Sequence, residues 1–591
     1  MKELVLTSLS FDGQRNDFEQ SVFLGHWCLD NNVVFERYKK QTLKSPYKNW
    51  DAVLDAANYV QELTKRIIIR IYPILNDYLN LDLSLKFWEI YLSPSLLNFL
   101  GIFYDRYLNI EKVVSLDDDY TIKIVKTPDD FRIIDKDIFY SNFLNSSGNL
   151  FLFSIILTEL NSKKLNLEFF QNIDMNHLYS SAGISLKVDS EIAVTQTYKE
   201  FILEKLFFNK YVNIGTVYGL SKFEKLYLQF KTLGPYTLCK EIISNVKNRK
   251  DRKKVFTFIP KNYLSFPITN SFEAIVSKYL HSFLPVPTKG TIESMKKNTP
   301  KLWVGTDIYN NKEIELGLVK EQRGKWISFQ HGGGYGALKS LPQTYFEYSL
   351  ATKFASWGWR FNHIQVDSNI INFPESPMLS KVRNLRNRNH KDGVLLISTD
   401  HPRAFYKLQS QLLTDQHECY EDGKSIFYNA LSNQIRSEFV YRPYPVKYCS
   451  IVEPIVRQNV KIDNTKYKNQ TDLYGKYRII VVDHISTSHL ISIAMNVPTI
   501  IFYDPNIFGL CEEAQQYYYS LHKAGIVFYS PGDAAEMLNR EFDNINDWWH
   551  NSERQKALNE FRKVQCDSSN QWKYNWVKFI RNEIADCESA V

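Results

Sequence analysis

Apolar residues recur along the chain with two different periods. Between Trp50 and about Tyr107 they return every three or four residues, which predicts helices that turn one face towards the core. Beyond about residue 320 they form short runs of strand length, each followed by a polar turn and often by a helical pattern. Strands that alternate with helices predict βαβ units and a parallel sheet, so the expected fold class is α/β.

Four of the predicted strands end in turns that are rich in polar side chains. The segments are KWISFQHGGG, GVLLISTDHP, SEFVYRPYP and YRIIVVDHISTSH, which begin at Lys325, Gly393, Ser437 and Tyr477. Ligands of open parallel sheets bind beyond the carboxyl ends of the strands. We therefore expect these four turns to contribute to one site.

The last of these turns places several polar side chains directly before a predicted helix. Serine and threonine are common N-caps, and a helix N-terminus presents unbonded N–H groups and a partial positive charge that suit a phosphate. An ordinary capped turn is the alternative, but three hydroxyl groups stand where one cap would suffice. The candidate donor-binding residues of this turn are Asp483, Ser486, Thr487 and Ser488.

The second and third turns add further candidates for donor binding. Pro402 favours an extended backbone at His401 and is predicted to begin the next helix, so His401 should point towards the ligand; a structural histidine is the alternative. Thr399 lies in the same turn. Arg442 suits a phosphate or carboxylate, with a surface ion pair as the alternative, and Tyr444 follows it.

The turn after Phe329 combines a histidine with a run of glycines. Gly332, Gly333 and Gly334 have no Cβ, so their N–H groups can approach an anion or sugar closely and adopt positive φ. The pattern matches neither the dinucleotide fingerprint nor an ATP-type P-loop. His331 is a candidate general base, with a structural role as the alternative, and Tyr335 is assigned with the glycines to donor binding.

Length and composition limit the possible classes of protein. The 591 residues are 44% hydrophobic and 23% charged, as in ordinary globular proteins of more than one domain. The expected domains are an N-terminal one over residues 1–370, a nucleotide-binding one over 371–550 and closing helices over 551–591. A net charge of +7 is mild for this length and gives little support to nucleic-acid binding.

Targeting and metal signals are weak. The seven cysteines include no C-x-x-C pair, which argues against a zinc site or a disulfide framework. No signal peptide or membrane-spanning run is recognisable, so a cytoplasmic location is expected. The basic run KNRKDRKK at residues 247–254 is either a solvated loop or a contact with the inner face of the plasma membrane.

The chain resembles a bacterial family of surface-polysaccharide transferases. The resemblance runs nearly end to end and is carried by LVLTSLS, FLGHWC, FWEIYLSPSLLNFLGIFYDRY, FQHGGGYG, ASWGW, YRPYP and VPTIIFYDP. It implies a GT-B-like architecture, in which two Rossmann-type domains face a cleft and the N-terminal one carries a helical elaboration. The C-terminal domain would hold a nucleotide-activated donor, and the last helices would pack back on the N-terminal domain.

A looser likeness concerns the donor. A His-Pro pair after one strand and a hydroxyl-rich turn after a later one also mark enzymes that use CMP-activated acidic sugars, so the likeness implies a CMP donor of the Kdo or nonulosonic acid type, with no metal and no cofactor beyond this co-substrate. His489 stands where many GT-B enzymes have a ribose-binding acid, and it is therefore a further candidate for donor binding. The acceptor would be a surface polysaccharide, a lipopolysaccharide or a lipid-linked glycan, deprotonated by His331 or Asp12. The alternatives are transfer of a polyol phosphate from a CDP-linked donor and a non-catalytic carbohydrate-binding protein.

Overall fold

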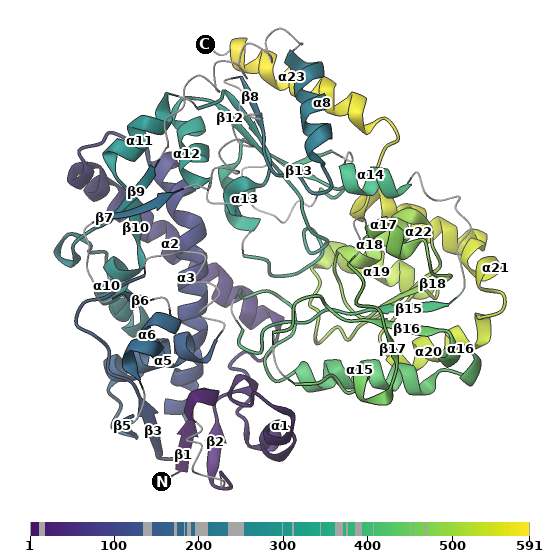
Figure 1. The fold of residues 1–591 in the computed structure, drawn as a ribbon, viewed down its shortest axis with the longest axis horizontal. Helices are drawn as coiled ribbons and strands as arrows, with labels where there is room; N and C mark the ends of the chain where they lie inside the picture. The colour runs from purple at the N-terminus through teal and green to yellow at the C-terminus, as the bar shows by residue number, and fades with distance from the viewer. Residues whose placement is uncertain are drawn as a thin grey trace.

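The computed structural model describes residues 2–10, 18–133, 145–170, 174–182, 184–185, 191–195, 211–233, 253–297, 299–309, 312–342, 344–360, 370–373, 376–383, 393–405, 407–448, 451–466 and 470–589. Two parallel sheets dominate this part of the chain, one in each half of the sequence (Figure 1). The fold is α/β, as expected.

The C-terminal half is built on a six-stranded parallel sheet in the order β17-β16-β15-β18-β19-β20. This is the strand order of a doubly wound Rossmann fold, in which the chain starts in the middle and returns there before crossing to the other edge. The central strands consist of buried valine, isoleucine and leucine, because helices cover both faces. The strands are β15 (Val394–Ile397), β16 (Phe439–Arg442), β17 (Lys461–Ile462), β18 (Ile479–Val482), β19 (Thr499–Phe502) and β20 (Val527–Phe528).

The helices of this half pack in two groups. On one side α15 (His417–Ala430) contacts α20 (Pro531–Glu541), and on the other α22 (Ser552–Gln565) contacts α18 (Thr487–Met495) and α19 (Glu512–Lys523). Shorter helices complete the layers, namely α14 (Pro377–Arg383), α16 (Asn433–Ser437), α17 (Gln470–Tyr474) and α21 (Ile545–His550).

The N-terminal half contributes a five-stranded parallel sheet in the order β14-β13-β12-β11-β8. Neighbouring strands of this sheet follow one another along the chain, so its strand order does not reverse as that of the C-terminal sheet does. The strands are β8 (Val212–Ile214), β11 (Leu302–Val304), β12 (Lys325–Phe329), β13 (Lys353–Ser356) and β14 (Ile370–Asn372). The connections include α12 (Glu313–Glu321) and α13 (Thr344–Leu350), while α8 (Lys222–Leu233) and α23 (Trp572–Ser589) pack against each other.

Two long helices form the helical elaboration that the spacing of apolar residues predicts. They are α2 (Trp50–Leu79) and α3 (Leu85–Val114), capped by the side chains of Asn49 and Ser84. They pack against each other, and α3 also packs along α12 (Figure 1). The apolar faces of α2 and α3 thereby join the core of the N-terminal half.

A further parallel sheet, which the sequence analysis did not predict, lies near the N-terminus in the order β2-β1-β3-β5. It comprises β1 (Lys2–Val5), β2 (Ser21–Phe23), β3 (Tyr120–Ile124) and β5 (Leu165–Phe169). Two antiparallel sheets contain β7 (Glu191–Thr195), β9 (Lys253–Phe258) and β10 (Pro285–Pro287), and β4 (Arg132–Ile133) and β6 (Ile184–Ser185). The remaining helices are α1 (Asn32–Tyr38), α5 (Ser146–Leu160), α6 (Met175–Ser181), α10 (Ser271–Phe283) and α11 (Lys289–Lys296).

The carboxyl ends of the two large parallel sheets face each other across the junction of the halves. Backbone hydrogen bonds join the loop after β12 to the loop after β19: the Lys339 N–H donates to the Gly509 carbonyl, and the Cys511 N–H to the Ala337 carbonyl, both at 2.9 Å. Helix α23 then packs on the N-terminal sheet, whereas α22 packs against α18 and α19 of the C-terminal half. This is a GT-B-like architecture, with the final crossing between α22 and α23 rather than at residue 550.

The segment after β15 departs from its predicted structure. No helix begins at Pro402; residues 402–405 and 407–416 are irregular, with left-handed backbone at Leu408 and Leu412, and α15 starts only at His417. The loop reaches the N-terminal half, where the Arg106 guanidinium donates to the Phe405 carbonyl. The helix predicted from the spacing of apolar residues does not form, because Phe405, Leu408 and Leu413 are buried against the N-terminal half of the molecule.

Candidate active site

The loop after β12 is tied to the tryptophan turn after β13 by one glutamine. The Gln330 side-chain oxygen accepts hydrogen bonds from the Trp357 N–H at 2.9 Å and from the Trp359 indole at 2.8 Å. Its amide nitrogen donates to the Gly332 carbonyl at 2.9 Å. The QHGGG and WGW segments are therefore two parts of one structure.

The glycines after His331 allow a close approach between the two halves. The Gly333 N–H donates to Thr487 Oγ1 at 3.0 Å, and a Cβ on Gly333 would lie 2.4 Å from the Ser486 carbonyl carbon. Only glycine fits there. Positive φ occurs instead at Gly336, whose φ of +66° brings it against the Trp359 ring. Close packing thus explains the glycine at position 333, and Gly332, Gly333 and Gly334 all lack positive φ.

His331 is linked to a buried carboxyl group through a tyrosine. The Tyr335 hydroxyl is hydrogen-bonded to His331 Nε2 and donates to Glu347 Oε2 at 2.5 Å. Glu347, on α13, is fully buried and also accepts a hydrogen bond from Ser328 at 2.9 Å. Because the tyrosine proton goes to Glu347, Nε2 of His331 carries the proton that it shares with the tyrosine oxygen. Tyr335 lies beneath the histidine with its ring buried, which differs from direct contact with a donor.

The surroundings of His331 keep its imidazole neutral. The side chain is 34% exposed, but the protein around it and the positive charge of Lys407 lower its pKa to about 4. A neutral imidazole can accept a proton at pH 7. Glu347 was not predicted; the one available signal is an acidic residue within the otherwise aromatic and apolar TYFEYSL helix.

The N-terminus of α18 carries the hydroxyl groups that the sequence singles out. Ser486 is the N-cap, and its side chain accepts a hydrogen bond from the Ser488 N–H at 3.2 Å. Ser486, Thr487 and Ser488 are all partly exposed. Through the Gly333–Thr487 hydrogen bond, this helix N-terminus adjoins the loop that begins with His331.

His489 requires a correction. Its Nδ1 accepts the Ser486 N–H at 3.3 Å, which completes a capping box, and its Nε2 is hydrogen-bonded to the Tyr518 hydroxyl at 2.9 Å. The side chain is fully buried, and this burial lowers its pKa to about 3. His489 therefore holds the start of α18 and cannot contact a donor.

Asp483 is also directed inwards. It accepts hydrogen bonds from Tyr420 at 2.9 Å and from Ser398, and it pairs with His484 at 2.8 Å. The Thr399 N–H in turn donates to the Tyr420 hydroxyl at 3.2 Å. These bonds hold the turns after β15 and β18 side by side, which differs from the donor contact predicted for Asp483.

His401 and Lys407 lie on the long loop after β15. Burial and neighbouring positive charges lower the pKa of His401 to about 3. Lys407 lines the same small cavity as His401, and its positive charge contributes to lowering the pKa of both His401 and His331. The loop also touches the α18 turn, because the Gln411 amide donates to the Ile485 carbonyl at 3.4 Å. Lys407 was not predicted, because the segment was expected to be helical.

Residues 2–580 match the family model described as LIC12162 family transferase, which covers nearly the whole chain. The chain belongs to the LIC12162 family of transferases. No curated protein matches this LIC12162 family transferase.

Among solved structures, the LIC12162 family transferase is similar to the wall teichoic acid polymerase TagF, with 12% identity, 65% of this chain and 90% of that chain covered, and a TM-score of 0.30. The Thermobaculum terrenum O-GlcNAc transferase has 10% identity, 92% and 98% coverage and a TM-score of 0.31. The spinosyn forosaminyltransferase SpnP has 12% identity, 50% and 74% coverage and a TM-score of 0.23. At such scores the fold assignment rests on the strand order and not on these likenesses.

The other residues predicted to belong to the site lie away from the contact between the His331 loop and the α18 turn, or outside the described ranges. Arg442 donates to the carbonyls of Asp463 and Thr465, both at 3.1 Å, and so supports the edge of the sheet. Tyr444 stacks on Tyr448 with 6.2 Å between ring centroids. Asp12 and residues 247–252 of the basic run lie outside the described residues.

The residues that the structure describes contain no group of three or more His, Cys, Asp or Glu side chains placed to hold a metal ion. Over the same ranges, no helix combines the length and the apolar character needed to cross a membrane.

Proposed function

We propose that this transferase is a glycosyltransferase that moves a sugar from a nucleotide-activated donor to a cell-surface polysaccharide or lipopolysaccharide acceptor. The observation that carries the proposal is the Gly333–Thr487 hydrogen bond. This bond joins the loop that carries His331 to the N-terminus of α18. The neutral His331 is hydrogen-bonded to Tyr335, which is in turn bonded to the buried carboxyl group of Glu347. A base for the acceptor and a binding site for the donor phosphate then lie side by side.

The geometry supports a direct displacement. The acceptor hydroxyl oxygen bonds to the anomeric carbon of the donor while the bond from that carbon to the phosphate oxygen breaks. The hydroxyl proton passes to His331, and the nucleotide leaves with the electron pair on its phosphate. Lys407 and the N–H groups at the start of α18 stabilise that negative charge. The bound phosphate also raises the pKa of His331, because a nearby negative charge favours the imidazolium.

We propose CMP as the nucleotide, linked to Kdo or a nonulosonic acid. Support comes from the placement of His401 and of the hydroxyl groups of Ser486, Thr487 and Ser488, because their turns follow the adjacent strands β15 and β18. This is the point where the strand order reverses, and ligands of such sheets bind there. A neutral His401 can donate an N–H to a phosphate oxygen.

A donor screen tests the proposal. The purified protein is mixed with CMP-Kdo, a CMP-linked nonulosonic acid, CDP-glycerol, UDP-glucose and GDP-mannose, and nucleotide release and the thermal shift are measured. We expect CMP-linked sugars to stabilise the protein and to release CMP. Use of CDP-glycerol alone would instead assign transfer of a polyol phosphate, and stabilisation by none of the nucleotides would overturn the enzyme proposal.

Paired variants locate the donor. Thr487→Val removes a hydroxyl while keeping the shape of the side chain, and should weaken CMP binding by about tenfold, since a hydrogen bond to a charged group contributes about 1.5–3 kcal/mol. Ser492→Ala is the control, because its hydroxyl bonds within the same helix to the His489 carbonyl at 3.0 Å. Equal CMP binding by wild type and Thr487→Val would place the donor elsewhere.

We further propose that the protein works in the cytoplasm, in contact with the inner face of the plasma membrane through α8 and α23. On this face Phe223 is 84% exposed and Tyr574 is 67% exposed, and the Lys573 ammonium lies 5.9 Å from the centre of the Tyr227 ring. Both helices also carry exposed lysines, namely Lys222, Lys231, Lys573 and Lys578. Aromatic and basic side chains together suit an anionic lipid surface.

Sedimentation with lipid vesicles tests this contact. The protein should pellet with vesicles containing phosphatidylglycerol and not with pure phosphatidylcholine, and Phe223→Ser should reduce the pelleted fraction. Phe169→Ser is the matched control, because Phe169 is 60% exposed on β5, a strand that lies far from α8 and α23 (Figure 1). Equal pelleting of both variants would contradict the contact.

A further inference from the structure

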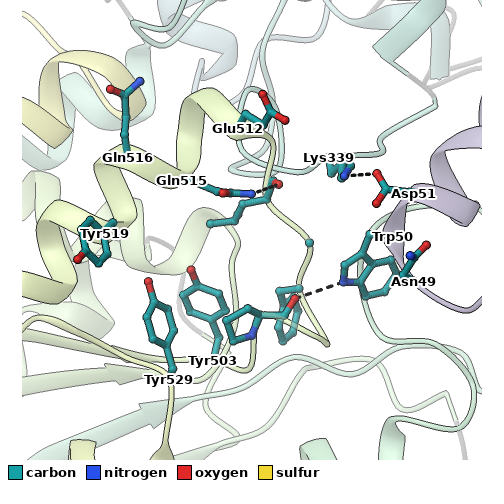
Figure 2. A pocket seen from close by; sticks show the side chains of 14 residues that line it. Asn49, Trp50, Asp51, Lys339, Tyr503, Glu512, Gln515, Gln516, Tyr519 and Tyr529 are labelled. Carbon is teal, nitrogen blue, oxygen red and sulfur yellow. Dashed lines mark hydrogen bonds and ion pairs between the residues drawn. The ribbon is translucent and has the colours of Figure 1, made fainter.

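A cavity opens between the start of α2 and the loop that follows β19. Its volume is about 620 Å³, within the range of about 300–1,000 Å³ typical of ligand pockets. Figure 2 shows Trp50 and Asp51 of α2 on one side and Tyr503, Tyr519 and Tyr529 on the other. The two walls therefore come from the two halves of the molecule.

The walls combine aromatic rings with polar groups that bind hydroxyls. The Tyr503 and Tyr529 rings meet edge to face with centroids 5.6 Å apart, and Tyr519 and Tyr529 are 51% and 38% exposed. On α19, Glu512, Gln515 and Gln516 line the same space. Aromatic rings pack on the C–H faces of a pyranose, while amides and carboxylates take its hydroxyl groups. The lining has both kinds of group.

The charges of the cavity disfavour a phosphate. Its one lysine, Lys339, forms an ion pair with Asp51, and Glu512 adds a further carboxylate. The described lining therefore has an excess of negative charge, whereas nucleotide sites use cations or helix N-termini to bind phosphate. Glu512 and Glu513 stand in the first turn of α19, where they favour the N–H groups of that helix and add to the negative charge. A neutral saccharide fits this cavity better than a second nucleotide.

The cavity is joined to the candidate active site by a single loop. That loop begins with His331 and ends with Lys339 in the cavity wall, where the Lys339 N–H donates to the Gly509 carbonyl. The Trp50 indole donates to the Pro505 carbonyl at 3.3 Å across the same junction. A glycan bound here would therefore contact both halves and the loop that carries the candidate base.

We propose that this cavity binds neutral sugar residues of the acceptor glycan. The acceptor role rests on the proposed glycosyl transfer, whereas saccharide binding itself does not. Tyr519 and Tyr529 would pack on the sugar, and Gln515, Gln516 and Glu512 would bind its hydroxyl groups. This arrangement selects the acceptor by units away from the reacting hydroxyl.

Glycan binding is tested with the full-length protein on a microbial glycan microarray, with each hit measured by titration calorimetry. We expect wild type to bind neutral oligosaccharides and Tyr519→Ala/Tyr529→Ala to bind them at least about tenfold more weakly. Tyr263→Ala is the control, since it removes an exposed tyrosine that does not line the cavity. Absence of any hit, or equal binding by the double variant and wild type, would overturn the proposal.

A parallel titration with CMP separates this proposal from the proposed function. The double variant should bind CMP as wild type does, because its substitutions lie outside the α18 turn. In a transfer assay its acceptor KM should rise about tenfold with little change in kcat. If wild type binds the glycan but no nucleotide, and the double variant loses glycan binding, the saccharide site is supported and only the proposed glycosyl transfer is overturned.

Discussion

Two turns meet at the candidate active site, and they are held in place in different ways. The start of α18 at residues 486–489 is shaped by its own side chains, since Ser486 and His489 form a capping box within four residues. The loop at residues 330–336 depends on partners far along the chain, because Gln330 bonds to Trp357 and Trp359, and Gly336 packs on Trp359. The first turn is a local structure and the second is a tertiary one.

The difference in support matches a difference in proposed role. Phosphate binding at a helix N-terminus needs mainly N–H groups and hydroxyls, which a capped helix supplies by itself. A general base also needs a defined ring orientation and proton position, which here require Tyr335 within the loop and Glu347 from outside it. Substitutions in the two turns should therefore separate chemistry from binding.

The largest effect is expected for His331→Ala. Loss of a positioned general base lowers kcat by about 10²- to 10⁴-fold, whereas donor affinity should stay within about threefold of wild type. His550→Ala is the control, since His550 is an exposed residue at the end of α21. Steady-state transfer rates and CMP titration measure the two quantities. An equal loss of kcat in both variants would show that His331 has no special role.

Gly333→Ala should have the next largest effect. Its Cβ would lie 2.4 Å from the Ser486 carbonyl carbon, so the two turns must move apart. A displacement of about 1 Å can lower a rate by about 10²-fold. Gly332→Ala is the matched control, because the atom nearest to its Cβ would be 4.0 Å away. The turnover number and the temperature of thermal unfolding are measured for both variants. Equal values for the two would contradict close packing as the reason for glycine at position 333.

Tyr335→Phe should have a smaller effect. The ring can stay stacked on Phe354, 5.7 Å away between centroids, while the hydroxyl that accepts from His331 is lost. That bond favours the protonated ring, so its loss lowers the pKa of His331 further. We expect kcat to fall about tenfold and the acidic limb of the kcat/KM profile to move to lower pH. A shift of the limb to higher pH would reverse the proton assignment.

The two turns also show what the sequence allowed us to predict. The hydroxyl-rich turn and the strands around it follow from local patterns, so β18, α18 and β19 appear where the apolar runs indicate. Glu347 and Lys407 were missed because their proximity to His331 depends on tertiary packing. The same limit explains the missing helix after Pro402, where burial against the N-terminal half outweighs local periodicity.

The smallest effect on activity, and the clearest on stability, is expected for His489→Gln. The pKa of His489 is about 3 in the folded protein, against 6.5 when exposed, so the unfolded chain binds the extra proton first as the pH falls. Its contribution to the free energy of unfolding is thus lost below pH 6.5, by about 2 kcal/mol at pH 5. Glutamine can complete the same capping box but does not titrate.

Urea unfolding at pH 7 and pH 5 measures this contribution. The drop in the free energy of unfolding between the two pH values should be about 2 kcal/mol smaller for His489→Gln than for wild type. The buried histidines at positions 281 and 401 titrate in both proteins, so they cancel in this difference. An unchanged drop would mean that His489 is not buried as a neutral ring, and its assignment to the capping box would be wrong. Retention of CMP binding by the variant would confirm that this histidine supports the turn without touching the donor.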